Sequence, residues 1–388
     1  MKKIVGIIAA AALAASAFAE VNIGLGANQA FAPVAYDGDD IVTVGPVANW
    51  DGLNNKNVGN GLSTGRVGLS FSAESENAGV VTDFHIENNE FDNAYGWVKP
   101  FSFLEIKAGK IDTNWRRLGF GYGVWNTLRP SAMDTAGDDL AFYRPHSPNF
   151  ALLLTPIEGL EIVYDYEADD EKIDDHEIYD ELWNHARYGA SYTIDGVGTI
   201  MAQLYGQEPA YNKDYDKKDW GVVGVAFELT GIENLYAQFG VQAPTTFAPL
   251  GDKEGEEIGN SNIKLGAGVS YTLDALTLHA YFNGAIKAND DGDYGDFGFA
   301  LGAGVDYALS DAYTLLADVR FINDKMIGDG DEENHVILFG GLEHHLTNAT
   351  LKLGFVGETK STVRGHLTDS GKLQDFTFGI PVVLDINF

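Results

Sequence analysis

The feature that most constrains the fold of this chain is a strict alternation of apolar and polar residues along its second half. In residues 262–272, apolar side chains occupy every second position and alternate with polar or small ones. Residues 276–287 and 297–307 repeat the pattern. Because successive side chains of an extended strand point to opposite faces, a period of two predicts β-strands with one apolar and one polar face.

The composition of the polar face separates two classes of all-β protein. A soluble β-sandwich also alternates, but its strands are short and its outer face is rich in charge. In this chain the polar face consists of glycine, serine and glutamine with occasional charged residues. Such a face is typical of the wet interior of a membrane β-barrel, so the apolar face is expected to meet lipid.

The connections between the expected strands alternate in length. Short turns such as 273–275, 309–312 and 346–349 contain the Asp, Asn and Ser residues that tight hairpins favour. Every other connection is long and acidic, as in 168–184 and 251–261. A weak repeat at the hairpin tips is also compatible with a solenoid. The alternation of short and long connections instead favours an up-and-down barrel with tight turns at one rim and open loops at the other.

We therefore expect an all-β fold, in which residues 20–388 form a single transmembrane antiparallel up-and-down β-barrel. The number of strands is about 16 to 18, and both values stay open because the strands near Val21 and Ala94 alternate least clearly. The longest interior connection, residues 112–146, follows the fifth expected strand. Aromatic residues near expected strand ends predict interfacial girdles: Trp97, Trp115, Trp125, Trp183, Trp220, Tyr188, Tyr271, Tyr307, Tyr313 and Phe388.

Residues 1–19 carry the pattern of a secretory signal peptide. Lys2 and Lys3 precede an apolar run, and Ala17-Phe18-Ala19 supplies a small-residue cleavage motif before Glu20. A membrane anchor is the alternative, but the run is shorter than the roughly 20 residues that a spanning helix needs. We expect residues 1–19 to be removed on export.

The charge balance excludes some partners. The chain has 57 acidic and 25 basic residues and a formal net charge of −32. Bulk charge therefore gives it no attraction to nucleic acid or to an anionic membrane surface. It contains no cysteine, and it is long enough to fold without disulfides.

The last ten residues, GIPVVLDINF, alternate as well, with apolar residues from Ile380 to Phe388 at every second position. Pro381 conflicts with a regular strand, because proline cannot donate a ladder hydrogen bond and a closed barrel has no free edge. We therefore predict a bulge at Pro381 or a weakened seam between the last strand and the first.

Taken together, the signal sequence ending Ala17-Phe18-Ala19, the alternating strands from Thr64 onward and the last strand FTFGIPVVLDINF resemble the Gram-negative outer-membrane porins and their relatives. The resemblance implies location in the cell outer membrane, contact with outer-membrane lipid and passage of small hydrophilic solutes. It also implies that Phe388 is an assembly signal, read by the outer-membrane assembly machinery. Homotrimers are common among such porins, although no residue here fixes a subunit interface.

In general porins the loop at the position of residues 112–146 folds into the lumen and forms a constriction. By that resemblance, the constriction residues are Arg66, Lys107 and Arg187 on the wall and Arg116, Arg117, Arg129, Asp134, Asp138 and Asp139 on the loop. A PEFGG-like signature that often marks this loop is absent, so the shape of the constriction is not specified. The alternative is a loop on the outer rim with solvated charges.

The expected inward positions carry both signs of charge, for example Asp165, Lys264 and Arg320. Opposed acids and bases set up a transverse field that favours polar solutes over apolar ones. The net negative charge leads to the hypothesis of a weak preference for cations.

We expect no catalytic residue, cofactor or metal. The acidic runs 289–296 and 328–334 lack the spacing of an EF-hand calcium loop, and residues 119–123 lack the spacing of a phosphate-binding loop. Pro145-His146-Ser147 and the pair His344-His345 show neither a base for a nucleophile nor an oxyanion hole.

Three functions remain open at this point. The first is a porin for passive diffusion of small hydrophilic solutes. The second is a substrate-specific channel of the sugar type, for which inward Tyr205, Tyr236 and Tyr281 could provide an aromatic path. The third is a closed barrel that acts as an adhesin or structural surface protein. A TonB-dependent transporter is disfavoured, because strand pairing is expected to begin too early in the chain to leave room for a plug domain.

Overall fold

The computed structural model describes residues 20–36, 38–47, 66–86, 89–111, 115, 148–168, 186–206, 221–244, 263–288, 294–323, 334–361 and 374–388. The expected signal peptide, residues 1–19, lies outside them. The described residues form one antiparallel sheet with twenty strand segments. These are β1 (Glu20–Tyr36), β2 (Ile41–Val47), β3 (Arg66–Glu74), β4 (Ala78–His85), β5 (Glu90–Phe101), β6 (Leu104–Lys110), β7 (Phe150–Leu154), β8 (Leu160–Tyr166), β9 (Ala186–Ile194), β10 (Gly198–Gly206), β11 (Gly221–Ile232), β12 (Leu235–Pro244), β13 (Ile263–Leu273), β14 (Leu276–Ala288), β15 (Tyr294–Ser310), β16 (Tyr313–Ile322), β17 (His335–His345), β18 (Ala349–Ser361), β19 (Gln374–Gly379) and β20 (Val382–Asn387).

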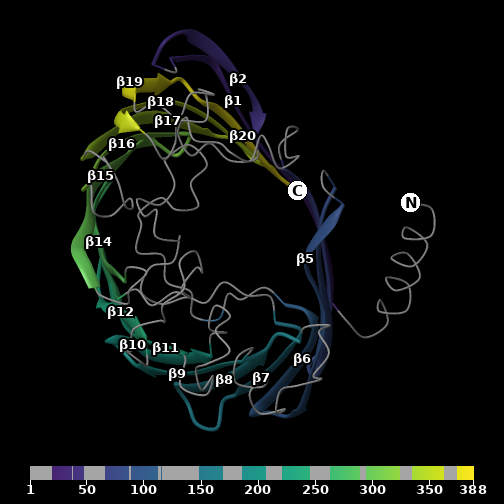
Figure 1. Ribbon diagram of the computed structural model, residues 1–388. Helices are drawn as coiled ribbons and strands as arrows, with labels where there is room; N and C mark the ends of the chain where they lie inside the picture. The colour runs from purple at the N-terminus through teal and green to yellow at the C-terminus, as the bar shows by residue number, and fades with distance from the viewer. Residues whose placement is uncertain are drawn as a thin grey trace, which may run out of the picture.

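The twenty segments make a closed barrel of 18 strands. On one side of β1, Arg66 of β3 pairs with Asn28 and Val47 of β2 pairs with Ala30, so β2 and β3 follow one another along one line. The segments β19 and β20 both pair with β1 and β18, and they form the last strand in two parts. Pairing of β1 with β20 closes the ring (Figure 1).

The strand order confirms the expected up-and-down topology. Each segment from β3 to β18 pairs with its neighbour in the sequence. The fifth barrel strand is β6, and the next strand begins only at Phe150. In the short turns, Asn234 and Asp274 adopt positive φ angles of 60° and 49°, a conformation that Asn and Asp tolerate better than most residues.

The two faces of the sheet divide as the alternation predicts. Leu338, Leu353 and Leu384 are 50%, 49% and 40% exposed on the outer surface. The inner face is polar, and ten of its charged or amide residues are at most 9% exposed: Asp165, Arg187, Gln203, Gln242, Lys264, Asn283, Asp318, Arg320, Lys352 and Glu358. An apolar outer surface of this extent is stable only against lipid, and the polar face then lines the lumen. Among the described residues, none belongs to a helix long and apolar enough to cross a membrane.

The expected aromatic girdle is present in part. Tyr271, Tyr307 and Tyr313 are 41%, 46% and 39% exposed on the outer surface beside short turns. Trp97, however, lies opposite the inward Lys107 in the β5–β6 ladder, so its side chain is on the inner face. Trp115 also contacts the inner wall, as described below. The interpretation of these two tryptophans as girdle residues is therefore wrong. Trp125, Trp183 and Trp220 lie outside the described residues.

Pro381 produces the predicted irregularity. Phe31 pairs with Val382 and Ala35 with Gly379, so residues 32–34 of β1 lie opposite only residues 380 and 381, which is a bulge. Toward β18 the register is continuous, and the Pro381 carbonyl accepts a hydrogen bond from the Gly354 amide at 3.0 Å. The strand thus keeps its pairing on one side and shifts by one residue on the other.

Candidate functional site: the lumen wall and a recess at β5–β9

A row of inward residues crosses the wall from β6 to β9. The ladder registers place Lys107 opposite Ala151, Ala151 opposite Asp165, and Asp165 opposite Arg187. Residues directly opposite each other in a ladder point to the same face. The sequence alternation therefore brings charges from three separate strands into one inward row.

The centre of this row is a buried ion pair. The Arg187 Nε atom donates to Asp165 Oδ2 at 2.8 Å, and Arg187 Nη2 also contacts that oxygen. The two residues are 1% and 2% exposed. Charge-assisted bonds of this kind offset the desolvation of both ions, and removing one partner leaves the other buried and uncompensated.

Trp115, from the connection that follows β6, packs on this pair. The Arg187 guanidinium carbon lies 5.7 Å from the centre of the Trp115 ring, within the range of a cation–π contact. A Cβ placed on Gly189 would lie 2.4 Å from a ring carbon of Trp115, so glycine at this position provides the room for the ring. Trp115 therefore lies against the inner wall.

Trp115, Lys107, Asp165 and Arg187 border a recess of about 310 Å³ in the inner wall. Its remaining lining residues are Asn93, Tyr95, Ile111, Pro148, Ala151, Leu153 and Val163. Lys107 lies 5.5 Å from the centre of the Tyr95 ring and 3.1 Å from Glu105 Oε1, while Lys99 lies 3.1 Å from Glu105 Oε2. The recess combines aromatic faces with charges that are already paired.

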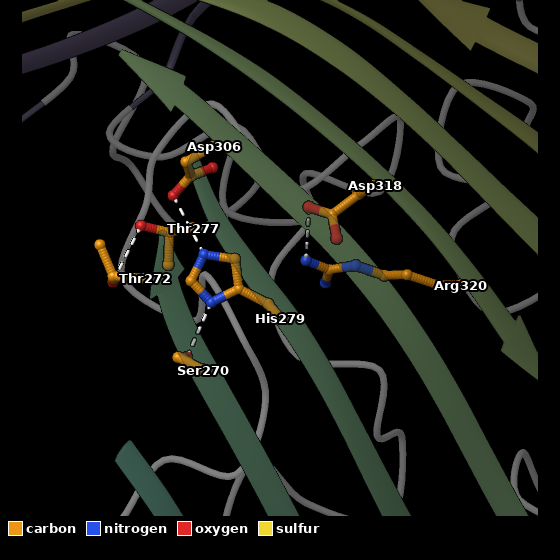
Figure 2. Close-up of polar contacts among 7 residues, drawn as sticks. All are labelled: Ser270, Thr272, Thr277, His279, Asp306, Asp318 and Arg320. Atoms are coloured by element: carbon orange, nitrogen blue, oxygen red, sulfur yellow. Dashed lines mark hydrogen bonds and ion pairs between the residues drawn. The ribbon is translucent and has the colours of Figure 1, made fainter. Parts of the chain in front are cut away.

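A second polar group lies on the wall formed by β13–β16, across the barrel (Figures 1 and 2). Arg320 Nη2 lies 3.5 Å from Asp318 Oδ2, and the Arg320 guanidinium carbon lies 5.5 Å from the centre of the Tyr281 ring. Arg320 is fully buried. Both walls thus carry an arginine that is paired with a carboxylate and packed on an aromatic ring.

Figure 2 shows His279 between Ser270 and Asp306 on three adjacent strands. Ser270 Oγ lies 2.8 Å from His279 Nδ1, and His279 Nε2 lies 3.2 Å from Asp306 Oδ2. Because an ionised carboxylate only accepts, Nε2 of a neutral His279 carries the proton and Nδ1 accepts from the serine. Thr272 and Thr277 form a further pair at 3.2 Å, one step nearer the turn.

Charged residues also line the seam between the last strand and the first. Lys352 Nζ lies 2.5 Å from Asp385 Oδ2 and 3.7 Å from Glu343 Oε1. Asn28 of β1 donates to the other oxygen of Asp385. Side chains therefore connect the strands that close the barrel, on the inner side of the ladder that carries the Pro381 bulge.

The structure describes the side chains of only two of the predicted constriction residues. Lys107 and Arg187 line the same recess. Arg66 pairs with Asn28 at the start of β3, and its side chain is outside the described part of the structure. The six loop residues also lie outside it: Arg116, Arg117, Arg129, Asp134, Asp138 and Asp139.

Sequence patterns do not reveal three residues that shape the recess. Trp115 and Tyr95 line it, and Gly189 lies behind the Trp115 ring. Gly189 does carry a signal in the sequence, because it leaves a gap between the inward residues Arg187 and Ser191 of β9, and a glycine inside a strand often marks the close approach of another group. Within the described residues, no group of three or more His, Asp or Glu side chains is arranged to hold a metal ion.

A closed antiparallel barrel with an apolar outer surface and a charged, hydrogen-bonded inner wall is the architecture of an outer-membrane channel. The sequence agrees with this class: the model of the Gram-negative porin family matches residues 6–363, and the chain belongs to that family. It is therefore a protein of the Gram-negative outer membrane, surrounded by lipid. Comparison with curated protein sequences gives no match.

Solved structures share the fold at low sequence identity. OccAB3 of Acinetobacter baumannii gives a TM-score of 0.54 at 10% identity, with 96% of this chain and 99% of that chain covered. OpdL of Pseudomonas aeruginosa gives 0.53 at 9%, covering 96% and 99%. OprD of the same species gives 0.51 at 11%, covering 95% and 95%. At these identities the likeness shows the fold of the barrel and nothing of its solute.

Proposed function

We propose that this porin is a passive diffusion channel for small hydrophilic solutes, with a weak preference for cations. The observation that carries the proposal is the composition of the inner wall. Acidic and basic side chains, together with amides, lie on its strands from β5 to β18. Such a wall solvates polar solutes and gives apolar ones no favourable contact.

A narrowing of the lumen near β6–β9 belongs to the proposal. Lys107 and Arg187 provide cations on the wall, and Trp115 brings the beginning of the long connection against them. We assign Arg66 to the same wall, and Arg116, Arg117, Arg129, Asp134, Asp138 and Asp139 to the loop side of the narrowing.

The barrel is proposed to act without catalysis, although Ser270, His279 and Asp306 form a chain of the kind found in hydrolases. Acyl transfer also needs backbone donors aimed at the oxyanion. Ser270 lies on the central strand of three, in register with Tyr236 and His279, so the amides beside it donate to the ladders instead. We assign this group to the polar lining.

Two assembly proposals accompany the channel. Phe388 is 71% exposed at the end of the last strand, which leaves its ring accessible as an assembly signal for the outer-membrane machinery. A homotrimer, as in many similar porins, would cover part of the apolar outer surface.

Liposome swelling tests the proposal. Purified, refolded protein is reconstituted into liposomes, which are then diluted into isotonic sugars and amino acids of increasing size. Diffusion predicts entry rates that fall smoothly with solute size. Entry of a single solute class would instead indicate a substrate-specific channel, and no swelling with any solute would indicate a closed barrel that acts as an adhesin or structural protein.

A further inference from the structure

We propose that the recess bordered by Trp115 and Arg187 is a binding subsite for one neutral, polyhydroxylated ring, that is, a monosaccharide unit. The inference deepens the proposed channel function and rests on it, since the solute reaches the recess through the lumen. It differs from plain diffusion because it predicts saturable binding at a defined place in the wall.

Two buried donors carry the first step. Arg187 Nη1 and Trp115 Nε1 are shielded from solvent and have no hydrogen-bond partner among the described residues. Both residues line the same recess, and Arg187 is 1% exposed. Buried N–H donors are nearly always satisfied, so two of them at one recess point to a ligand that brings acceptor oxygens.

The charge of the recess favours a neutral ligand over an anion. Arg187 is bonded to Asp165, and Lys107 shares Glu105 with Lys99. Asp83 accepts from the Asn93 amide at 2.9 Å, which places a third carboxylate beside the recess. An entering anion would meet Asp83, Glu105 and Asp165 as well as the cations, whereas hydroxyl oxygens need only the two spare N–H groups.

The shape of the recess favours a ring. Trp115 and Tyr95 line it with aromatic rings, each with a cation on one face, and Leu153, Val163 and Pro148 add apolar surface. The C–H face of a pyranose is apolar, and its slightly positive hydrogens are attracted to the negative face of an aromatic ring. The volume of about 310 Å³ lies at the lower end of the range for small-molecule sites, so the recess fits one sugar unit and not an oligosaccharide.

The test is a single-channel blocking measurement on the full chain in planar bilayers. Glucose is titrated into both compartments, with the acyclic polyol sorbitol as the control for viscosity and gluconate as the anionic analogue. We expect the current to fall with glucose and to reach a plateau. With sorbitol or gluconate, we expect only the linear change in current that follows the bulk conductivity. A matching block by sorbitol, or a stronger block by gluconate, would overturn the proposal.

Two substitutions locate the binding. Trp115→Phe keeps a ring and removes the indole N–H, and it is expected to raise the half-blocking glucose concentration about 3- to 10-fold. Trp115→Ala also removes the apolar face and is expected to raise it more than about 10-fold. Thr277→Val is the control, because it removes a hydroxyl hydrogen from the inner wall on β14, across the barrel (Figures 1 and 2). If the Trp115 variants bind glucose as the parent protein does, the assignment is wrong.

A second measurement separates this inference from the channel itself. Quenching or enhancement of tryptophan fluorescence by glucose is followed in detergent, where no conductance is needed. Saturable change in the parent protein and its loss in Trp115→Phe would support the subsite even in a barrel that conducts no ions. Ion conductance without any saturable glucose signal would reject the subsite and leave the diffusion channel intact.

Discussion

Trp115 and Arg187 meet at the inner wall, with the indole centre 5.7 Å from the guanidinium carbon. One residue belongs to the long connection after β6 and the other to β9, and the glycine at position 189 leaves the space that the indole fills. This contact joins the loop to the wall, and the first prediction concerns it.

A methyl group at Gly189 should displace Trp115. In Gly189→Ala the new Cβ would begin 2.4 Å from the Trp115 ring and 2.7 Å from Val163 Cγ1, and overpacking of this kind costs about 1–3 kcal/mol unless the ring leaves and the Val163 side chain turns. Because Trp115 lies on a connection and not in a strand, we expect the ring to leave and the single-channel conductance to change while the barrel stays folded. Gly340→Ala is the control, since a Cβ there meets no atom within 4 Å. Equal conductance in the two variants would argue against a wall contact of the loop.

Removing one partner of the Asp165–Arg187 ion pair should destabilise the barrel more than removing both partners. Asp165→Asn leaves Arg187 buried without a carboxylate, and such a loss destabilises by about 3–5 kcal/mol. The double variant Asp165→Asn/Arg187→Gln removes both charges and should recover most of that loss. Denaturant unfolding, followed by the heat-modifiable mobility of the barrel, measures both.

Glu105→Gln provides the comparison for this second prediction. Its partners Lys99 and Lys107 have side chains that are 38% and 28% exposed, and solvated pairs contribute about 0–1 kcal/mol each. A similar effect of Glu105→Gln and Asp165→Asn would mean that Arg187 is solvated in the membrane-embedded protein.

The sequence predicted those parts of the structure that follow from a period of two. Alternation assigned Asp165, Arg187 and Arg320 to the inner face, and the ladder registers confirm this. Counting turns gave the range of 16 to 18 strands and the place of the long connection, and the structure has eighteen strands. The irregularity at Pro381 is predictable because the missing N–H of a proline depends on that residue alone. The bulge lies in β1, opposite residues 380 and 381.

The recess could not be predicted in this way, because it depends on contacts between strands and a connection that are distant in the sequence. Trp115 has no periodic neighbours, so no pattern says which face it meets. Gly189 is informative only together with the ring that fills its space. The segments β2 and β3 pair with successive parts of β1 and count as one barrel strand. Only the ladder register shows this, because the alternation of residues does not.

Phe388 should matter for assembly more than for stability. The Phe388 amide donates to the Leu25 carbonyl at 2.8 Å and the Leu25 amide to the Phe388 carbonyl at 3.0 Å, and these backbone bonds survive in Phe388→Ala. The side chain is 71% exposed, so the refolded variant should lose less than about 1 kcal/mol. In cells we expect a severalfold fall in the amount of folded protein in the outer membrane. Leu309→Ala, which removes another exposed apolar side chain, 52% exposed beside a short turn, is the control. Normal levels of Phe388→Ala in the membrane would reject the assembly role.

The preference for cations should depend strongly on salt. The net charge of −32 raises the local concentration of cations, and this effect extends over the Debye length, about 30 Å at 0.01 M and about 3 Å at 1 M. On the wall itself Arg187 and Arg320 are each paired with a carboxylate, so the lining adds little net field. The reversal potential under a tenfold KCl gradient should therefore indicate cation preference near 0.01 M and fall toward zero near 1 M. Preference for chloride at low salt, or a preference unchanged by salt, would show that the paired wall charges and not the overall charge set the selectivity.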